Sequence, residues 1–547
     1  MISMKKVLVY ILLNFALLQL NAQANSANKT TLSDSLNGHK VLLDAEGKII
    51  SWMLPQSKAY SQLLYQRWNF IKTNVPNSPG PEPRSDYPQY FFYCAYRPEN
   101  GSLQPDMWMN DVGERIPNWF ESARLYYAYS GDTTVMLIVK KLVDYVIAHG
   151  TSPSTFQWPG FPYTTTNAGD TIFYGFTSAG RFVLHETQVD HAGDMGLTYY
   201  RLYQYTGDQK YKTAAINIAN TLSGKARDGS AKQSVWPYRV VMNTGEVKAE
   251  YGANWFPCYA LLDNLVKDKI GNVSAYINAM VKLRKFILDF PMKTGYWTDG
   301  HTDTDIDSYT YKSNMSASNA TLYMLDDHEF DPEWKTDVPK LIKWTEDNFV
   351  LRCAPGDPAN QWGANLVGEQ DSFLYKMDYQ TARYAAGCAR WYAVSGDAAY
   401  KEKAYRSLNW VTYCNDANGL VFESPVSKGI SSWWSDCYGE GPRMFYPAMA
   451  AIPEWAPPGE NHILYSEGVL KNVVYSNKEI NYTATAKEGV EYLRLAFRPA
   501  KVTLNGKPVV MYKDLKQQGY ILTNLGNGDY ALTIKRNIAG NIIITGF

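Results

Sequence analysis

The chain of 547 residues is longer than one ordinary hydrophobic core can organise, so two or more domains are expected. Its 53 basic and 53 acidic residues give a formal net charge of zero and form no block of like charge, which disfavours nucleic acid as a partner. Hydrophobic residues make up 45% of the chain and aromatic residues 14%, a composition that excludes a disordered protein.

Residues 1–24 are predicted to be a secretory signal peptide. Lys5 and Lys6 precede an apolar run at 7–20, and the small residues of 21–24 follow as at a cleavage site. The apolar run is too short for a membrane span. We therefore expect a protein exported to a bacterial periplasm or secreted, with no membrane insertion after the signal is cleaved.

Residues 25–57 are interpreted as a polar leader with a short β segment, after which the chain becomes helical. Three aromatic runs end in the same dipeptide, at Gly131-Asp132, Gly207-Asp208 and Gly396-Asp397. Glycine can take the left-handed conformation that ends one helix, and aspartate can accept the free amides that open the next. The repeats therefore predict tight helical hairpins.

Apolar periodicity predicts five helical hairpins between residues 58 and 455. Their paired helices are 116–129 with 135–148, 195–205 with 211–222, 255–266 with 276–288, 320–325 with 334–349, and 381–394 with 400–411. Helices at 60–71 and 444–452 supply a sixth pair. Six pairs predict an (α/α)6 toroid, because the alternative of a flat solenoid uses shorter repeats.

A Pro-rich linker at 453–459 separates the helices from a segment of short alternating strands. Asn505-Gly506 within it is a strong two-residue hairpin signal. Residues 461–547 are therefore predicted to form a small β-sandwich.

The loops that lead into the inner helices form the mouth of such a toroid, and the first of them is 107–116. Asp111, Glu114 and Arg115 crowd one helix start there, beside Trp108. Asp111 and Glu114 are catalytic candidates, and Trp108 and Arg115 are candidates for substrate binding. The structural alternative is a capping box, with Asp111 as the cap and Glu114 three residues later.

The second candidate loop, 185–194, contains His185, Asp190 and His191, and so two of the seven histidines of the chain. Asp190 or His191 could act as acid or base, and His185 is a substrate-binding candidate. Glu186 and Asp190 would share a face if the segment is already helical. The spacing is not HExxH, and no metal site is predicted.

The third candidate loop is 431–443, before the last inner helix. Trp433 and Trp434 can stack on a sugar, Asp436 and Glu440 are acidic, and Arg443 can hold a carboxylate in a fork. Glu440 is the catalytic candidate of this loop, and the other residues are binding candidates. A buried aromatic plug is the structural alternative.

Weaker signals lie at 368–371 with Tyr379 and Arg383, which are further binding candidates, and in the acidic loop 299–311. Alternating aspartates in that loop hint at calcium, but the complete EF-hand pattern is absent and a solvated loop is favoured. The sequence has no Gly-rich phosphate loop and no G-x-S-x-G elbow, and no cofactor is predicted.

Carbohydrate chemistry fits these residues, with an oligosaccharide or polysaccharide as the partner. Glycosidic cleavage needs a proton donor and a second carboxylate. Asp111 or Glu114, across the mouth from Asp190 or Glu440, would supply such a pair.

The layout of 58–547, a toroid followed by a small β-sandwich, together with the polar loops above, resembles bacterial polysaccharide-degrading enzymes of Bacteroidetes glycan-utilisation systems. Within them the chain is most similar to uronic-acid-active glycoside hydrolases such as family 154. The resemblance implies an exo-acting hydrolase that removes glucuronic acid or a related sugar, with Arg115, Arg383 or Arg443 as carboxylate clamps. The chain lacks the adjacent Cys pair of toroidal arabinofuranosidases with a thiolate metal site.

Two other functions remain open. A polysaccharide lyase on the same toroid would use a base such as His191 or a tyrosine and an arginine to neutralise the uronate. A non-catalytic glycan-binding protein would need only the paired Trp433-Trp434 and the surplus of tyrosine, of which the chain has 42.

Overall fold

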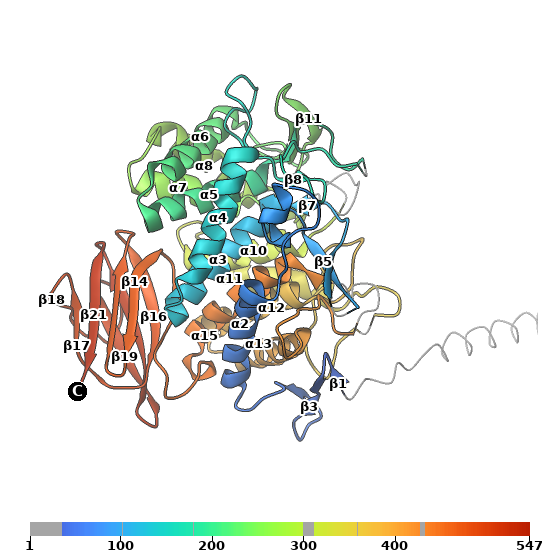
Figure 1. The fold of residues 1–547 in the computed structure, drawn as a ribbon. Helices are drawn as coiled ribbons and strands as arrows, with labels where there is room; N and C mark the ends of the chain where they lie inside the picture. The colour runs from blue at the N-terminus through green and yellow to red at the C-terminus, as the bar shows by residue number, and fades with distance from the viewer. Residues whose placement is uncertain (1–34, 101, 179, 299–310, 358, 427–432) are drawn as a thin grey trace, which may run out of the picture.

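The computed structural model describes residues 35–547 except 101, 179, 299–310, 358 and 427–432. The predicted signal peptide, the first part of the leader and the aspartates of the acidic loop lie outside the described residues. The described chain forms a helical body with a β domain at one end (Figure 1).

Six helical hairpins make up the helical body within the described residues (Figure 1). Five of them are α3 (Val112–Ser130) with α4 (Thr134–His149), α5 (Val189–Thr206) with α6 (Gln209–Lys225), α7 (Phe256–Lys267) with α8 (Val273–Asp289), α10 (Asn314–Asp326) with α11 (Trp334–Thr345), and α12 (Asp378–Ser395) with α13 (Ala398–Val411). The sixth joins the two ends of the helical region: α2 (Gln56–Thr73) packs against α14 (Glu440–Arg443), which α15 (Phe445–Ala451) continues.

The first helix of each of the five consecutive hairpins, together with α14, belongs to a closed inner ring. Contacts run from α3 to α5, α7, α10 and α12 in turn, then to α14, and α14 contacts α3 again. The second helix of each of these five hairpins, together with α2, lies outside this ring. The fold is therefore an (α/α)6 toroid, as the hairpin pattern predicted.

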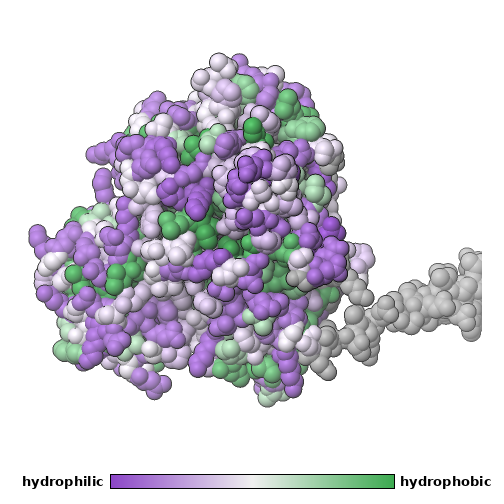
Figure 2. Space-filling view, viewed as in Figure 1, coloured by the Kyte–Doolittle hydropathy of each residue, from purple (hydrophilic) through white to green (hydrophobic). Residues whose placement is uncertain are grey.

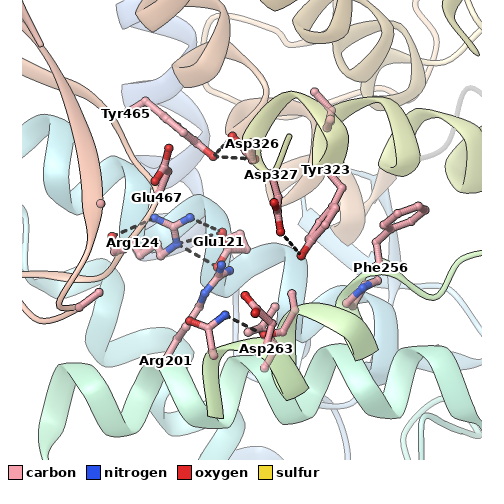
Figure 3. Close-up of a pocket in the computed structure, with 18 of the residues that line it drawn as sticks. Glu121, Arg124, Arg201, Phe256, Asp263, Tyr323, Asp326, Asp327, Tyr465 and Glu467 are labelled. Atoms are coloured by element: carbon pink, nitrogen blue, oxygen red, sulfur yellow. Dashed lines mark hydrogen bonds and ion pairs between the residues drawn. The ribbon is translucent and has the colours of Figure 1, made fainter. Parts of the chain in front are cut away.

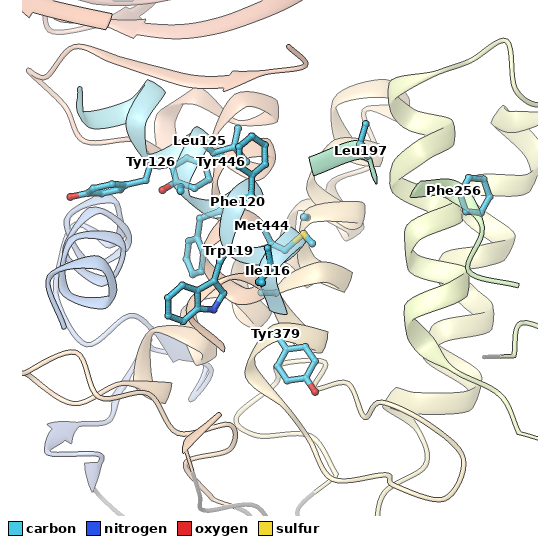
Figure 4. Packing of buried hydrophobic residues seen from close by; sticks show 14 of the residues in the cluster. Ile116, Trp119, Phe120, Leu125, Tyr126, Leu197, Phe256, Tyr379, Met444 and Tyr446 are labelled. Atoms are coloured by element: carbon cyan, nitrogen blue, oxygen red, sulfur yellow. The ribbon is translucent and has the colours of Figure 1, made fainter. Parts of the chain in front are cut away.

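The inner and outer helices differ in how they are buried. The outer helix α4 buries one face, with Val135, Val139, Leu142 and Val146 at helical spacing, and the molecular face in Figure 2 is accordingly mostly hydrophilic. The inner helix α3 is buried almost throughout. Figure 4 shows its Trp119 and Phe120 among the packed side chains of the core.

The Gly-Asp dipeptides make the turns that the sequence predicted. Gly131, Gly207 and Gly396 have φ of 78°, 80° and 72° and end the inner helices α3, α5 and α12 in the left-handed conformation. The side chain of Asp208 then accepts the amide of Lys210 at 3.0 Å. These turns place the C-terminal ends of the inner helices at one end of the toroid and their N-terminal ends at the other.

Residues 461–547 fold into two antiparallel sheets that form the predicted β-sandwich. Their orders are β13-β16-β20-β19 and β14-β15-β21-β17-β18. The strands are β13 (His462–Ser466), β14 (Leu470–Ser476), β15 (Glu479–Ala484), β16 (Gly489–Leu495), β17 (Pro499–Leu504), β18 (Lys507–Pro508), β19 (Gly519–Gly526), β20 (Asp529–Arg536) and β21 (Gly540–Gly546). Asn505 and Gly506, with φ of 52° and 76°, make the tight turn between β17 and β18.

The β-sandwich covers the C-terminal ends of the inner helices. The His462 ring stacks on Tyr129 at 3.8 Å, and its Nδ1 lies 2.9 Å from the Tyr129 carbonyl oxygen. Arg124 donates to the Ser466 carbonyl oxygen at 2.8 Å. The opposite end of the toroid is free of this domain.

That opposite end carries short strands between the hairpins (Figure 1). They are β5 (Ala95–Glu99), β6 (Ser102–Pro105), β7 (Asn110–Asp111), β8 (Thr165–Thr166), β9 (Glu186–Gln188), β10 (Arg239–Val241), β11 (Glu246–Ala249) and β12 (Trp433–Trp434). Near the N-terminus lie β1 (Ser35–Leu36), β2 (His39–Lys40), β3 (Leu42–Leu43) and β4 (Ile49–Ile50), and α9 (Pro291–Thr294) follows α8. No described helix is long and apolar enough to cross a membrane.

Candidate active site

The N-terminal turns of the inner helices bring four of the predicted catalytic residues together. Asp111 directly precedes α3 and Glu114 lies in its first turn, while Asp190 and His191 lie in the first turn of α5. Because α3 and α5 are neighbours in the inner ring, these side chains converge at the open end of the toroid. Asp111, Asp190 and His191 are at most 6% exposed.

The imidazole of His191 lies between two carboxylates. Its Nδ1 is 3.9 Å from Asp111 Oδ1, and its Nε2 is 3.9 Å from Asp190 Oδ2. Asp111 occupies the N-cap position of α3, but its side chain makes no capping hydrogen bond, so the capping alternative is wrong for this residue. Instead, pairing of Asp111 with Thr165 in the β7–β8 ribbon fixes its backbone beside α5.

Asp111, Glu114 and His191 each place one ligand atom within 4.8 Å of the other two. Two carboxylate oxygens and one imidazole nitrogen are a donor set that divalent transition metals accept. The same set can also move a proton between neighbouring groups. We call Asp111, Glu114, Asp190 and His191 the mouth cluster.

A chain of polar side chains runs across the axis of the toroid next to the mouth cluster. We call it the axial ring; its members are Asn118, Glu440, Arg383, Asn319, Asn254 and Asp190. Asn118 donates to Glu440 Oε1 at 2.9 Å, and Arg383 donates to the same oxygen. Arg383 also donates to Asn319 at 2.6 Å, and Asn319 donates to Asn254 at 2.9 Å. Asn254 donates to Asp190 Oδ2 at 3.4 Å, so the network ends on the mouth cluster.

The axial ring links every inner helix or the residue that leads into it. A buried polar network of this kind rigidifies its members when each one is hydrogen-bonded. Asp190 is therefore held from one side by Asn254 and faces His191 on the other. The sequence did not single out the three asparagines, because an amide within a helix or just before one carries no catalytic signature.

Two of the predicted carboxylate clamps are engaged inside the protein. Arg115 is fully buried and donates to Asn110 Oδ1 at 2.6 Å and to the Tyr90 carbonyl oxygen, so it supports the loop before α3. Arg383 is bound to Glu440 and Asn319. Their role as clamps of a substrate carboxylate stays a prediction, and the structure shows both of them bound to groups of the protein.

Tyr379 lies in the first turn of α12, and its hydroxyl donates to Glu369 Oε1 at 2.9 Å. Burial raises the pKa of Tyr379 well above its usual value, and the nearby carboxylates of Glu369, Glu423, Glu440 and Glu114 raise it further. The phenol therefore stays protonated and serves as a hydrogen-bond donor. Glu369 belongs to the weaker sequence signal at 368–371.

His185 lies outside the mouth cluster. Its Nδ1 is 2.9 Å from the Tyr163 hydroxyl, and its ring packs edge-on against Phe156 at 5.0 Å. Glu186 is in strand β9, where Arg239 donates to it at 2.6 Å. The segment is therefore extended there, and the expectation that Glu186 and Asp190 share a helical face is wrong.

The remaining binding candidates occupy three places. The Arg181 guanidinium lies 4.4 Å from the centre of the Trp108 ring. Trp433 and Trp434 pair with β5 as strand β12, and Asp436 follows in a short 3-10 helix. Arg443, one turn after Glu440, lines a cavity on the other side of the axial ring.

No family model and no curated protein matches the chain. Solved structures match its fold at low sequence identity, 11–12% for the three described next. A sugar epimerase from a ruminal bacterium has a TM-score of 0.51 at 12% identity, over 72% of this chain and 98% of the epimerase. The cellobiose 2-epimerase of Spirochaeta thermophila has a TM-score of 0.51 at 12% identity, over 73% and 96%. A D-mannose isomerase has a TM-score of 0.51 at 11% identity, over 74% and 100%. The likeness establishes the (α/α)6 toroid.

Proposed function

We propose that the chain is an exported glycoside hydrolase that removes a uronic acid from the end of an oligosaccharide. The observation that carries the proposal is the position of His191 between Asp111 and Asp190 at the open end of the toroid. The toroidal enzymes that share the fold act on sugars, which supports a carbohydrate as the substrate. A fold hosts many reactions, so the reaction is argued from the site.

The mouth cluster contains the groups that glycosidic cleavage requires. We assign the proton donor to the pair of Asp111 and Glu114, because two carboxylates this close disfavour a second negative charge. The donor protonates the glycosidic oxygen as its bond to the anomeric carbon breaks. Asp190, held by Asn254, is the second carboxylate, which activates the attacking water or attacks the sugar itself. His191 lies between the two and keeps them in position.

Recognition of a uronate needs a cation near the mouth, and Arg181 is the candidate. Its guanidinium stacks on Trp108, three residues before Asp111 in the same loop. A planar guanidinium binds carboxylates in a bidentate fork, and the Trp108 indole offers an apolar face to a sugar ring. This activity is the one expected of an enzyme similar to glycoside hydrolase family 154.

Abstraction of a proton from a sugar carbon is the second candidate reaction. An imidazole flanked by carboxylates is a suitable base, and protonated Tyr379 is a suitable donor. The reaction would be elimination on a uronate polymer or epimerisation. The sugar epimerases among the similar solved structures favour keeping this candidate.

Mass spectrometry of products from a panel of uronate-containing oligosaccharides, run in light and heavy water, tests the proposal. Hydrolysis predicts a gain of one water across the products. Elimination predicts no gain and a rise in absorbance near the ultraviolet edge, and epimerisation predicts uptake of deuterium with no cleavage. Either of the last two results contradicts the hydrolase. Absence of any product, with Asp190→Asn changing affinity alone, indicates a glycan-binding protein.

A further inference from the structure

A second cavity, of about 500 Å³, lies at the opposite end of the toroid from the mouth cluster. Its walls are residues of the inner helices and of the 465–468 and 486–489 segments of the β-sandwich. Figure 3 shows Tyr465 and Glu467 reaching into it from the β-sandwich, with Arg124 beside Glu467 and Tyr323 on the other side. The axial ring separates this cavity from the mouth, and Asn319 of that ring is part of its wall.

Three other arginines of the cavity wall have carboxylate partners within the protein. Arg124 lies 2.7 Å from Glu121, and Arg201 pairs with the same carboxylate. Arg390 lies 2.7 Å from Asp326. Each of these arginines is therefore ion-paired before any ligand arrives, although Arg124 and Arg201 share one carboxylate.

Arg443 differs from them. Among the described residues its nearest ion-pair partner is Glu440, whose Oε1 lies 3.9 Å from Arg443 Nη2. The buried Nε of Arg443 has no hydrogen-bond partner. That Glu440 oxygen already accepts from Asn118 and Arg383. The Arg443 side chain is 17% exposed and lines the cavity. Asp194 and Glu121 of the same wall attract its charge, but neither forms an ion pair with it among the described residues, so a positive charge without a close ion-pair partner faces the cavity. Burying a charge without a partner is costly, and an anion in the cavity would offset that cost.

The rest of the wall suits hydroxyl groups. Asp194 lines the cavity from α5, and burial raises its pKa to about 6. Burial also raises the pKa of Glu467 to about 7. A protonated carboxyl group donates as well as accepts hydrogen bonds, which holds for Asp194 below about pH 6 and for Glu467 below about pH 7. The amide of Asn319 and the rings of Tyr323 and Tyr465 complete a wall that is partly polar and partly aromatic.

We propose that this cavity is a second, non-catalytic binding site for a small acidic sugar, whose carboxylate pairs with Arg443. Its hydroxyl groups would face Asp194 and Asn319, and its ring would lie toward Tyr323 and Tyr465. The volume falls within the range of roughly 300–1,000 Å³ that is typical of small-ligand sites. The proposal concerns recognition of a sugar acid and is independent of the reaction at the mouth.

Isothermal titration of the full chain with D-glucuronate, D-glucose and acetate tests this site. We expect D-glucuronate to bind measurably better than either other probe, since the site recognises both an anion and hydroxyls. Arg443→Met should remove this binding event or weaken it at least tenfold, and Arg443→Lys should restore part of it. Ala260→Phe, which fills the cavity from α7 without removing a charge, should weaken it as well.

Arg181→Met, at the mouth, separates the two sites. If Arg181→Met abolishes all D-glucuronate binding while Arg443→Met and Ala260→Phe leave it intact, the second site is refuted and the proposed function stands. Equal affinity for acetate or for D-glucose also overturns the proposal, because it requires both parts of the ligand. If Arg443→Met does not fold, as judged by circular dichroism, Ala260→Phe decides the question.

Discussion

Arg383 and Glu440 form an ion pair on the axis of the toroid, where their side chains are 0% and 1% exposed. The pair joins α12 to α14, and hydrogen bonds to Asn319 and Asn118 extend it to α10 and α3. Glu440 therefore lies where the inner ring closes, because α14 meets α12 through Arg383 and meets α3 through Asn118. A charge at this depth depends on its partner for compensation.

Arg383→Met should therefore destabilise the protein strongly. Removing one member of a buried pair leaves the other uncompensated, which costs roughly 3–5 kcal/mol. Urea unfolding followed by circular dichroism measures the change. Lys343→Met, which breaks the exposed Lys343–Asp347 pair at 2.7 Å, is the matched control and should cost at most about 0.5 kcal/mol. Equal losses in the two variants would show that the axial pair contributes no more than a surface pair.

Asp190→Asn should abolish most of the activity while leaving the fold intact. The amide keeps the shape of the side chain but cannot act as base or nucleophile, so kcat/KM should fall by about 10²–10⁴-fold. Asp208→Asn is the control, since asparagine caps helix α6 about as well as aspartate does. A loss below tenfold for Asp190→Asn would remove Asp190 from the catalytic roles.

The helices and the toroid could be predicted from the sequence because apolar periodicity and the Gly-Asp turns are local signals. Gly131, Gly207 and Gly396 each end an inner helix as expected, and the turns fix which end of every inner helix lies at the mouth. Asp111, Asp190 and His191 were predicted from their position before the inner helices together with their acid–base chemistry. Position and residue type were therefore enough to identify convergent residues of the mouth cluster.

The direction of a side chain could not be predicted in the same way. Arg115 and Arg383 lie at the right helix starts, but the partners that engage them, Tyr90, Asn319 and Glu440, come from other parts of the chain. Arg443 follows Glu440 by three residues, and that single turn moves it past the axial ring into the other cavity. These outcomes depend on long-range packing.

Arg181→Met should impair the use of a uronate substrate more than the use of its neutral analogue. If Arg181 pairs with the substrate carboxylate, its removal should raise KM at least tenfold for a glucuronoside and leave the corresponding glucoside unaffected. Steady-state kinetics on both substrates checks this. The same loss on the glucoside would mean that Arg181 supports Trp108 rather than the carboxylate.

Chelators should leave the activity unchanged. Asp111, Glu114 and His191 could hold a divalent cation by their spacing, but our proposal uses them as acid, base and positioning groups. Dialysis against EDTA followed by assay, with and without added Zn²⁺, Ca²⁺ or Mn²⁺, tests the choice. Loss of activity on dialysis and its recovery with one cation would contradict metal-free chemistry and turn the three residues into ligands.

Asp194 should make the folded protein less stable as pH rises through the weakly acidic range. Burial raises its folded-state pKa from 3.8 to about 6, so between these values the folded state binds more protons than the unfolded state. The stabilisation is fully present below pH 3.8 and is lost as pH rises through about 6, at a cost on the order of 3 kcal/mol. Asp194→Asn, which cannot ionise, should flatten the change in unfolding free energy between pH 4 and pH 7.

Denaturant unfolding of the wild type, Asp194→Asn and the exposed control Asp208→Asn across that interval measures the difference. Parallel curves for the wild type and Asp194→Asn would show that the carboxyl of Asp194 ionises in the folded state as readily as in the unfolded chain.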